Sequence, residues 1–215
     1  MVQADPPVPV PAPDDGPLGV TALLLCGGAG RRLGGADKPL LNWQGQPLVE
    51  RVAACVRPQV AGILVSANRN LDRYARYGTV VTDRLSGFAG PLAGIASGLR
   101  ASQTPWLLAC PGDAPELPID LVARLQAGLR NLSDSTRPPA AVAHDGARMQ
   151  PLPLLLHASV EASLLEYLDS GRRSVLGWLD SLHPAVVDFT DQARAFHSCN
   201  GPDDFPGGFQ PAICD

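Results

Sequence analysis

The fold is indicated first by the stretch VTALLLCGGAGRRLGGADK, which occupies residues 20–38. Its first six residues, from Val20 to Leu25, form a continuous apolar run, which is typical of a strand buried on both faces of a parallel sheet. The run passes directly into a loop with five glycines within nine residues. Because glycine permits positive φ and close backbone approach, several N–H groups of such a loop can converge on one anion. The stretch therefore predicts a strand that ends at a phosphate-binding loop.

Three cationic residues accompany this loop, namely Arg31, Arg32 and Lys38, and their charges suit a triphosphate. The loop is not a Walker A sequence, because it lacks Gly-Lys-Ser/Thr. It is not a GxGxxG fingerprint either, because Leu33 takes the place of the third glycine. The alternative interpretation is a flexible surface loop with solvated charges. The position directly after a buried strand favours the phosphate site.

Outward from this loop, strand-like and helix-like patterns alternate along the chain. We expect strands at residues 62–67, 79–82 and 106–110, and helices at residues 47–60, 91–101 and 118–129. This order predicts an α/β fold with a mostly parallel sheet and helices on both faces. In the second half we expect strands at residues 140–144, 152–157 and 185–189, and helices at residues 158–168 and 172–182. Their less regular order predicts an antiparallel addition to the parallel half.

The two ends of the chain differ from its centre. Residues 1–19 hold six prolines and no aromatic residue, which predicts a disordered, proline-rich leader. Residues 20–205 are expected to form a single domain, and residues 206–215 an irregular tail.

Composition argues against several classes of protein. The 215 residues carry 17 basic and 21 acidic side chains, a net charge of −4, which is unlike a protein that grips nucleic acid by overall charge. No apolar run approaches the roughly 18 residues of a membrane span, and no basic residue precedes Arg31 as a secretory signal would require. The five cysteines form no CxxC pair, which fits reduced thiols. We therefore expect a cytoplasmic protein without nucleic-acid or membrane partners.

Polar residues gather after the expected parallel strands. Ser66, Asn68 and Arg69 stand at the end of the second strand, Asp83 follows the third and Asp113 the fourth. Since ligands of open α/β sheets bind beyond the carboxyl ends of the strands, we expect these side chains to share one site with the glycine loop.

Asp113 is a candidate for Mg²⁺, which binds through one or two carboxylates plus substrate phosphates. The alternative for Asp113 is a turn or a helix cap. Asp83 has two open interpretations, a hydrogen bond to a ribose or base edge and the cap of a turn. The four histidines lie far apart without ligand spacing, which argues against a metal cluster or a catalytic triad. The pair Arg172 and Arg173 either begins a solvated helix or faces a phosphorylated substrate.

The residues from Leu25 to Lys38 closely resemble the signature loop of the molybdenum cofactor guanylyltransferase family. Further matches fall in the same order along the chain, at residues 66–69, 83, 90–94, 111–115, 171–173 and 200–202. The resemblance covers residues 20–205 and implies one Rossmann-like, three-layer nucleotidyltransferase domain. It also implies the transfer of GMP from GTP to molybdopterin, which forms the guanine dinucleotide cofactor and pyrophosphate with the help of Mg²⁺.

The resemblance implies roles for individual residues. It places GTP against Leu25, Cys26, Gly27, Gly28, Lys38, Ser66, Asp83 and Asp113, with the metal on Asp113. The pterin side is assigned to Arg172, Arg173 and Asn200. As a hypothesis on catalysis, Mg²⁺ on Asp113 bridges phosphate oxygens while Arg31, Arg32 and Lys38 stabilise the departing pyrophosphate. The transient partners for cofactor handover would be the molybdenum insertion enzyme and an apo-molybdoenzyme or its chaperone.

The chain departs from the family pattern at three places. Cys26 replaces an alanine, Ser66 stands where an asparagine often contacts the nucleotide, and Gln150 precedes a proline where His-Pro is common. Two other functions stay open: a molybdopterin cytidylyltransferase, and a catalytically silent carrier of nucleotide or pterin. Cytidylyltransferases tend to open with Leu-Ala-Ala-Gly, whereas this chain has Gly27 and Gly28, which favours guanine.

Overall fold

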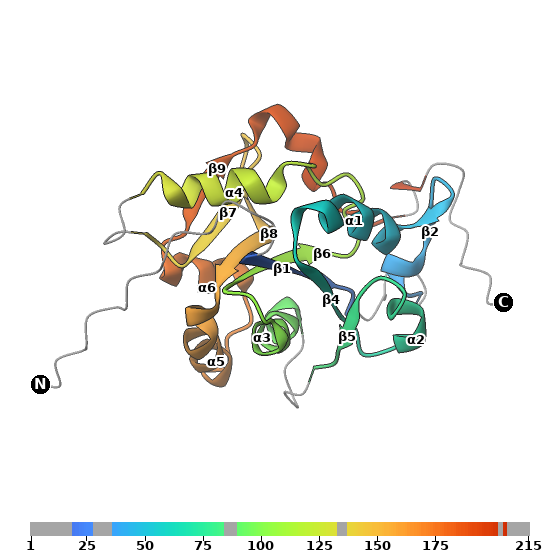
Figure 1. Cartoon of the computed structure of the whole chain (residues 1–215), viewed down its shortest axis with the longest axis horizontal. Helices are drawn as coiled ribbons and strands as arrows, with labels where there is room; N and C mark the ends of the chain where they lie inside the picture. Colours follow the sequence, from blue (N-terminus) through green and yellow to red (C-terminus); the bar gives the residue numbers. More distant parts are fainter. Residues whose placement is uncertain (1–18, 28–35, 84–89, 133–136, 202–203, 206–215) are drawn as a thin grey trace, which may run out of the picture.

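The protein is built on one seven-stranded sheet with helices on both faces (Figure 1). The computed structural model describes residues 19–27, 36–83, 90–132, 137–201 and 204–205. The strands of the sheet are β1 (Val20–Leu25), β4 (Gly62–Ser66), β5 (Thr79–Val81), β6 (Trp106–Pro111), β7 (Ala140–His144), β8 (Met149–His157) and β9 (Ala185–Asp188). The α-helices are α1 (Leu48–Val56), α2 (Leu71–Tyr74), α3 (Pro91–Ala101), α4 (Leu121–Arg130), α5 (Glu161–Asp169) and α6 (Val175–Leu182). The predicted α/β fold is confirmed, whereas the predictions for residues 1–18 and 206–215 lie outside the described residues.

The strand order is β5-β4-β1-β6-β8-β7-β9. The strands β5, β4, β1 and β6 pair in parallel, as do β7 and β9, while β8 pairs antiparallel with both of its neighbours. The predicted antiparallel addition is therefore confirmed, and within the described sheet it consists of one reversed strand. Because β8 runs against β6, its beginning lies at the edge where the parallel strands end.

The core has two halves, one on each face of the sheet. Helices α1 and α4 cover one face of the sheet, and α3, α5 and α6 cover the other (Figure 1). The apolar side chains of each group pack against the sheet as a separate cluster. The central strand β1 serves both halves, since Ala22 and Leu24 belong to the first cluster and Leu23 to the second. This two-sided burial explains the continuous apolar run of its sequence.

Several element boundaries differ from the sequence-based prediction. The helix expected over residues 47–60 ends at Val56 and continues as a short 3₁₀ turn, Arg57–Gln59, because Pro58 has no N–H to extend the α-helical ladder. The helix expected from residue 172 begins at Val175, where Ser174 caps it by accepting a hydrogen bond from the Gly177 N–H at 3.1 Å. The expected helix over 118–129 begins at residue 121, and the strand expected from residue 152 begins at 149.

A second, small sheet was not predicted. It is the hairpin of β2 (Asn42–Trp43) and β3 (Gln46–Pro47), turned by Gln44 and Gly45 at φ values of 52° and 90°. Positive φ at both central residues is the geometry of the tight turns that join hairpin strands. Further 3₁₀ segments are η3 (Lys38–Leu40), η5 (Ala158–Val160) and η6 (Thr190–Phe196).

We expect Gly94→Ala to destabilise the fold by about 1–3 kcal/mol, the usual effect of overpacking. A Cβ on Gly94 would lie 2.7 Å from the Ser66 Oγ and 2.8 Å from the Leu25 Cδ2, so these side chains or α3 itself would have to shift. Urea unfolding followed by circular dichroism measures the change. Gly62→Ala is the matched control, because no atom of the described residues lies within 4 Å of its Cβ position. Equal losses in the two variants would contradict the close contact at Gly94.

Candidate functional site

A cleft of about 680 Å³ opens where β1, β4 and β6 end. The chain passes from β1 to β4 on one side and returns to β6 on the other, so this edge is the switch point of the sheet, where open α/β sheets bind ligands. The cleft is lined by residues from each of these strand ends, by the start of α3 and by the start of β8. They are Leu25, Gly27, Ser66, Asn68, Arg69, Asp83, Gly90, Pro91, Gly94, Pro111, Asp113, Leu152 and Ser198.

The ends of β1 and β6, which both contribute to the cleft, approach each other closely. The Gly112 N–H donates to the Leu25 carbonyl at 3.1 Å, and a Cβ on Gly112 would lie only 2.7 Å from the Cys26 Sγ. The Cys26 N–H in turn donates to the Ser66 carbonyl at 2.9 Å. Burial raises the pKa of the Cys26 thiol, with Asp37 and Asp113 adding to the effect, so this cysteine stays neutral. Cys26 is buried next to Gly112 and packs as a small apolar residue.

Three predicted site residues from distant parts of the chain meet beside the cleft. The Lys38 ammonium forms an ion pair with the Asp113 Oδ2 and donates a hydrogen bond to the Asn200 Oδ1 at 2.9 Å. The Lys38 and Asp113 side chains are 22% and 16% exposed, so solvent screens their interaction only in part. The structure thus brings together a cation and a carboxylate that were both predicted to contact GTP and an amide that was assigned to the pterin side.

Asp204, which the sequence reasoning missed, holds the segment that carries Asn200. Its Oδ2 accepts hydrogen bonds from the backbone N–H groups of Asn200 and Gly201 at 2.6 and 2.8 Å. Its Oδ1 lies 3.0 Å from the His197 Nε2. The His197 contact and the two backbone donors lower the pKa of Asp204 to about 2, so the carboxylate stays charged and keeps these donors.

Asp37, the residue before Lys38, was also missed, and its side chain makes several polar contacts. Its carboxylate, 8% exposed, accepts from the Tyr74 hydroxyl at 2.8 Å and from the Asn70 amide at 2.7 Å, and it lies 3.4 Å from the Arg69 Nε. The Tyr74 side chain is fully buried. These contacts tie the end of the glycine loop to the segment after β4. The available signal was an acid between the basic residues of the loop, but its partners lie in α2, a helix of four residues, and in the two residues before it.

The remaining predicted residues divide into three groups. Leu25, Gly27, Ser66 and Asp83 line the cleft, as expected from the strand-end argument. Arg172 stacks over the Tyr167 ring at 4.2 Å, and Arg173 donates to the Leu168 carbonyl at 2.8 Å, so this pair covers the end of α5. Neither arginine is among the described lining residues, and their pterin role stays a prediction. The predictions for Gly28, Arg31 and Arg32 lie outside the described residues.

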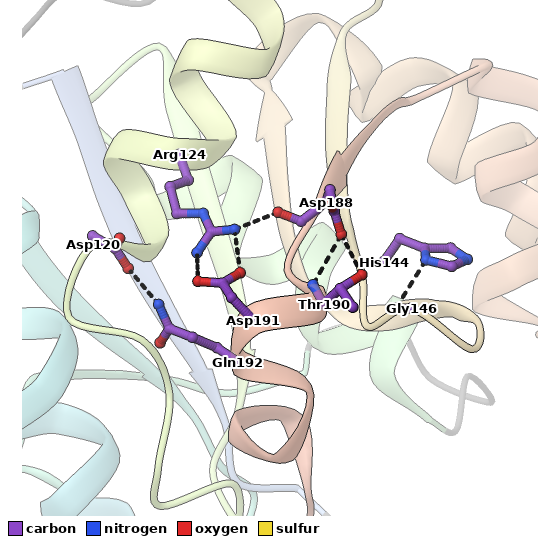
Figure 2. Close-up of polar contacts among 8 residues, drawn as sticks. All are labelled: Asp120, Arg124, His144, Gly146, Asp188, Thr190, Asp191 and Gln192. Carbon is purple, nitrogen blue, oxygen red and sulfur yellow. Dashed lines mark hydrogen bonds and ion pairs between the residues drawn. The ribbon is translucent and has the colours of Figure 1, made fainter.

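A second polar cluster lies at the ends of β7 and β9 (Figure 2). The Arg124 guanidinium holds both carboxylate oxygens of Asp191, at 2.8 and 2.9 Å, and also contacts the Asp188 carbonyl. His144 accepts from the Gly146 N–H at 3.1 Å. Within the described ranges no group of three or more His, Cys, Asp or Glu residues could hold a metal ion. The contacts in Figure 2 join η6 to α4 and β9, so we assign this cluster a role in stabilising the fold.

The described helices include none that is both long and apolar enough to cross a membrane.

The parallel sheet, the cleft at its switch point and the lysine–carboxylate pair beside it define a Rossmann-like α/β protein with a nucleotide-sized site. Residues 22–184 match the model of the MobA-like NTP transferase domain. The chain belongs to this family of nucleotidyltransferases, as its resemblance to the guanylyltransferases indicated.

Named relatives agree with this assignment. The chain is 41% identical over 187 residues to the molybdenum cofactor guanylyltransferase of Shewanella sediminis, covering 86% of this chain and 93% of the relative. It is 41% identical over 185 residues to the enzyme of the same name from Shewanella halifaxensis, covering 86% and 90%. Among solved structures, it resembles molybdopterin-guanine dinucleotide biosynthesis protein A from Archaeoglobus fulgidus with a TM-score of 0.66 and 23% identity, over 86% of this chain and 94% of the other. At this identity the structural likeness supports the fold alone.

Proposed function

We propose that this protein transfers GMP from GTP to the molybdopterin cofactor and releases pyrophosphate. The observation that carries the proposal is the meeting of Lys38, Asp113 and Asn200 beside a switch-point cleft, in a chain 41% identical to relatives named molybdenum cofactor guanylyltransferase. Both of the relatives described above bear the guanylyltransferase name, which favours guanine over the cytidylyl alternative.

For this reaction the protein has to position the two substrates and supply charges that stabilise the phosphates. The terminal phosphate of molybdopterin attacks the α-phosphorus of GTP in line, and the bond from this phosphorus to the bridging oxygen of pyrophosphate breaks. The nucleophile is already an anion, so no general base is required. Lys38 supplies a cation for the phosphates, and we assign Arg31 and Arg32 the same task on the sequence alone. Such fixed charges stabilise a departing pyrophosphate without reorganisation.

The residues present fit a magnesium ion that is shared with the substrate. Asp113 lines the cleft with a partly exposed carboxylate. A single carboxylate agrees with the coordination that Mg²⁺ prefers, one or two carboxylates plus substrate phosphates. When bound there, Mg²⁺ would offset the charge of the phosphate oxygens. The Lys38 ammonium already faces the Asp113 carboxylate, so the two residues together set the charge at this point.

A labile pterin product must be passed on, so we also propose transient partners. These are the molybdenum insertion enzyme and an apo-molybdoenzyme or its chaperone, which meet the protein in the cytoplasm. The reduced-thiol pattern of the five cysteines supports this compartment.

Calorimetry of the full chain with GTP, CTP and ATP, each with and without Mg²⁺, tests the proposed function. We expect GTP to bind tighter than CTP by at least about tenfold, as one or two hydrogen bonds to a base edge would give. Pyrophosphate release from GTP should then require molybdopterin. A preference for CTP would move the protein to the cytidylyl reaction, and GTP binding without turnover would favour the carrier.

A further inference from the structure

Two loops at the rim of the cleft are joined by a pair of reciprocal hydrogen bonds. Asn68, which follows β4, donates through its Nδ2 to the Asp83 Oδ2 at 2.9 Å. In return its Oδ1 accepts from the backbone N–H of Asp83, which follows β5, at 3.0 Å. Because an amide offers a donor and an acceptor side by side, asparagine can satisfy both groups at once. The pair fixes the orientation of the Asp83 carboxylate.

The second oxygen of this carboxylate has no hydrogen-bond partner within the described part of the chain. The Asp83 Oδ1 is buried and accepts no hydrogen bond from the residues that the structure describes, while Asp83 itself lines the cleft. A buried acceptor without a partner carries a desolvation cost, and a carboxylate oxygen carries a larger one than a neutral group. A ligand in the cleft can remove this cost only with an N–H or O–H donor, since an ionised carboxylate accepts and never donates.

The position of Asp83 relative to the sheet indicates which part of a bound nucleotide it would contact. It follows β5, which lies two strands from β1 in the order β5-β4-β1-β6. Neighbouring strands are about 4.8 Å apart, so the end of β5 lies on the order of 10 Å from the end of β1. Lys38 and Asp113 sit on the β1 and β6 side of the cleft. A nucleotide whose phosphates lie there would extend its nucleoside toward Asp83.

We propose that Asn68 is a positioning residue that holds Asp83 so that its Oδ1 accepts a hydrogen bond from the nucleoside of the bound nucleotide. The donor is an N–H of the guanine edge or a hydroxyl of the ribose. The inference rests on the proposed nucleotide site and extends it to a residue with no other assigned task. Asn68 acts through Asp83 and does not itself touch the reacting phosphates.

Calorimetry of GTP binding to Asn68→Ala and Asn68→Asp tests this role. Asn68→Asp keeps the shape and the acceptor for the Asp83 N–H but replaces the donor with a second carboxylate. We expect both variants to bind GTP at least about tenfold more weakly, in the range for hydrogen bonds to charged groups. KM for GTP should rise by a similar factor while kcat changes little, because the loss falls on ground-state and transition-state binding alike. Asn42→Ala is the control, because Asn42 is an exposed asparagine, and its GTP affinity should equal that of the wild type.

A double-variant comparison separates positioning from general damage to the fold. In an Asp83→Asn background, adding Asn68→Ala should weaken GTP binding by less than about twofold, because the residue that Asn68 orients is already altered. Unchanged affinity in Asn68→Ala, or a full additional loss in the Asp83→Asn background, would overturn the proposal.

Nucleotide analogues identify the donor. Inosine, 1-methylguanosine, 2′-deoxyguanosine and 3′-deoxyguanosine triphosphates each lack one donor. The affinity ratio of wild type to Asn68→Ala should fall toward unity with the analogue that lacks the group facing Asp83. The same ratio with all four analogues would refute the contact. If the wild type prefers CTP, the proposed guanine selectivity is wrong. The role of Asn68 is then tested separately, by the ratio of the CTP affinities of wild type and Asn68→Ala.

Discussion

Asp113→Ala should reduce pyrophosphate release from GTP and molybdopterin to background, a loss of at least about 10²-fold. The variant removes the carboxylate that faces Lys38 and that we assign to the metal. Both the ion pair with Lys38 and the proposed metal site are therefore lost together. The backbone of Asp113 still accepts from the Cys199 N–H at 3.0 Å, and the side chain is not part of the apolar core. The fold should therefore survive, as checked by circular dichroism and thermal unfolding.

Two matched variants define the cause of the Asp113 effect. Asp113→Asn keeps the size of the side chain and removes its charge, so it should be nearly as inactive as alanine. Asp120→Ala removes a carboxylate from the same connection between β6 and α4, where it contacts Gln192 at 3.4 Å, and should stay active. Near-normal turnover by folded Asp113→Ala would rule out both the metal role and the charge role.

Lys38→Ala should weaken GTP binding by roughly 10- to 100-fold, the usual range for a charge-assisted contact. The variant deletes the ammonium that reaches Asp113 and Asn200 and leaves the Asp113 carboxylate without its cation. Calorimetry with GTP measures the loss. Guanosine, which has no phosphates, should bind wild type and variant equally and serves as the ligand control.

A chemical readout supplements the binding data on Lys38, because it is the single lysine of the chain. Apart from the terminal amine, Lys38 carries the one amine of the sequence that an acetylating reagent can modify. Bound GTP should slow its acetylation, as followed by peptide mass spectrometry. Unchanged GTP affinity in Lys38→Ala, together with acetylation that GTP does not slow, would show that the lysine does not contact the phosphates.

The parts of the fold that the sequence predicted well have strong local signals. The apolar run Val20–Leu25 and the proline-initiated helix Pro91–Ala101 have the expected bounds, and so does the strand Ala140–His144. The hairpin β2–β3 and the helix α2 were missed because elements of two to four residues are too short to show a period.

The candidate site was predictable in its position but not in its internal contacts. Strand-end reasoning found Ser66, Asp83 and Asp113, because the carboxyl ends of parallel strands share one edge. The bond between Lys38 and Asn200 joins residues 162 positions apart, and no local pattern encodes such a distance. Asp37 was overlooked for the same reason, since its donors Asn70 and Tyr74 lie 33 and 37 positions away, one just before and one within the unpredicted helix α2.

The reversed direction of β8 has a consequence for directed evolution of the protein's selectivity for its second substrate. In a wholly parallel sheet, mutational libraries aimed at a ligand are placed in the loops that follow strands. Here Leu152, near the start of β8, lines the cleft, whereas His157 at its end pairs with Trp106 at the opposite edge of the sheet. A library that retunes acceptor choice should therefore diversify the residues that lead into β8, and one placed after it would sample surface far from the chemistry.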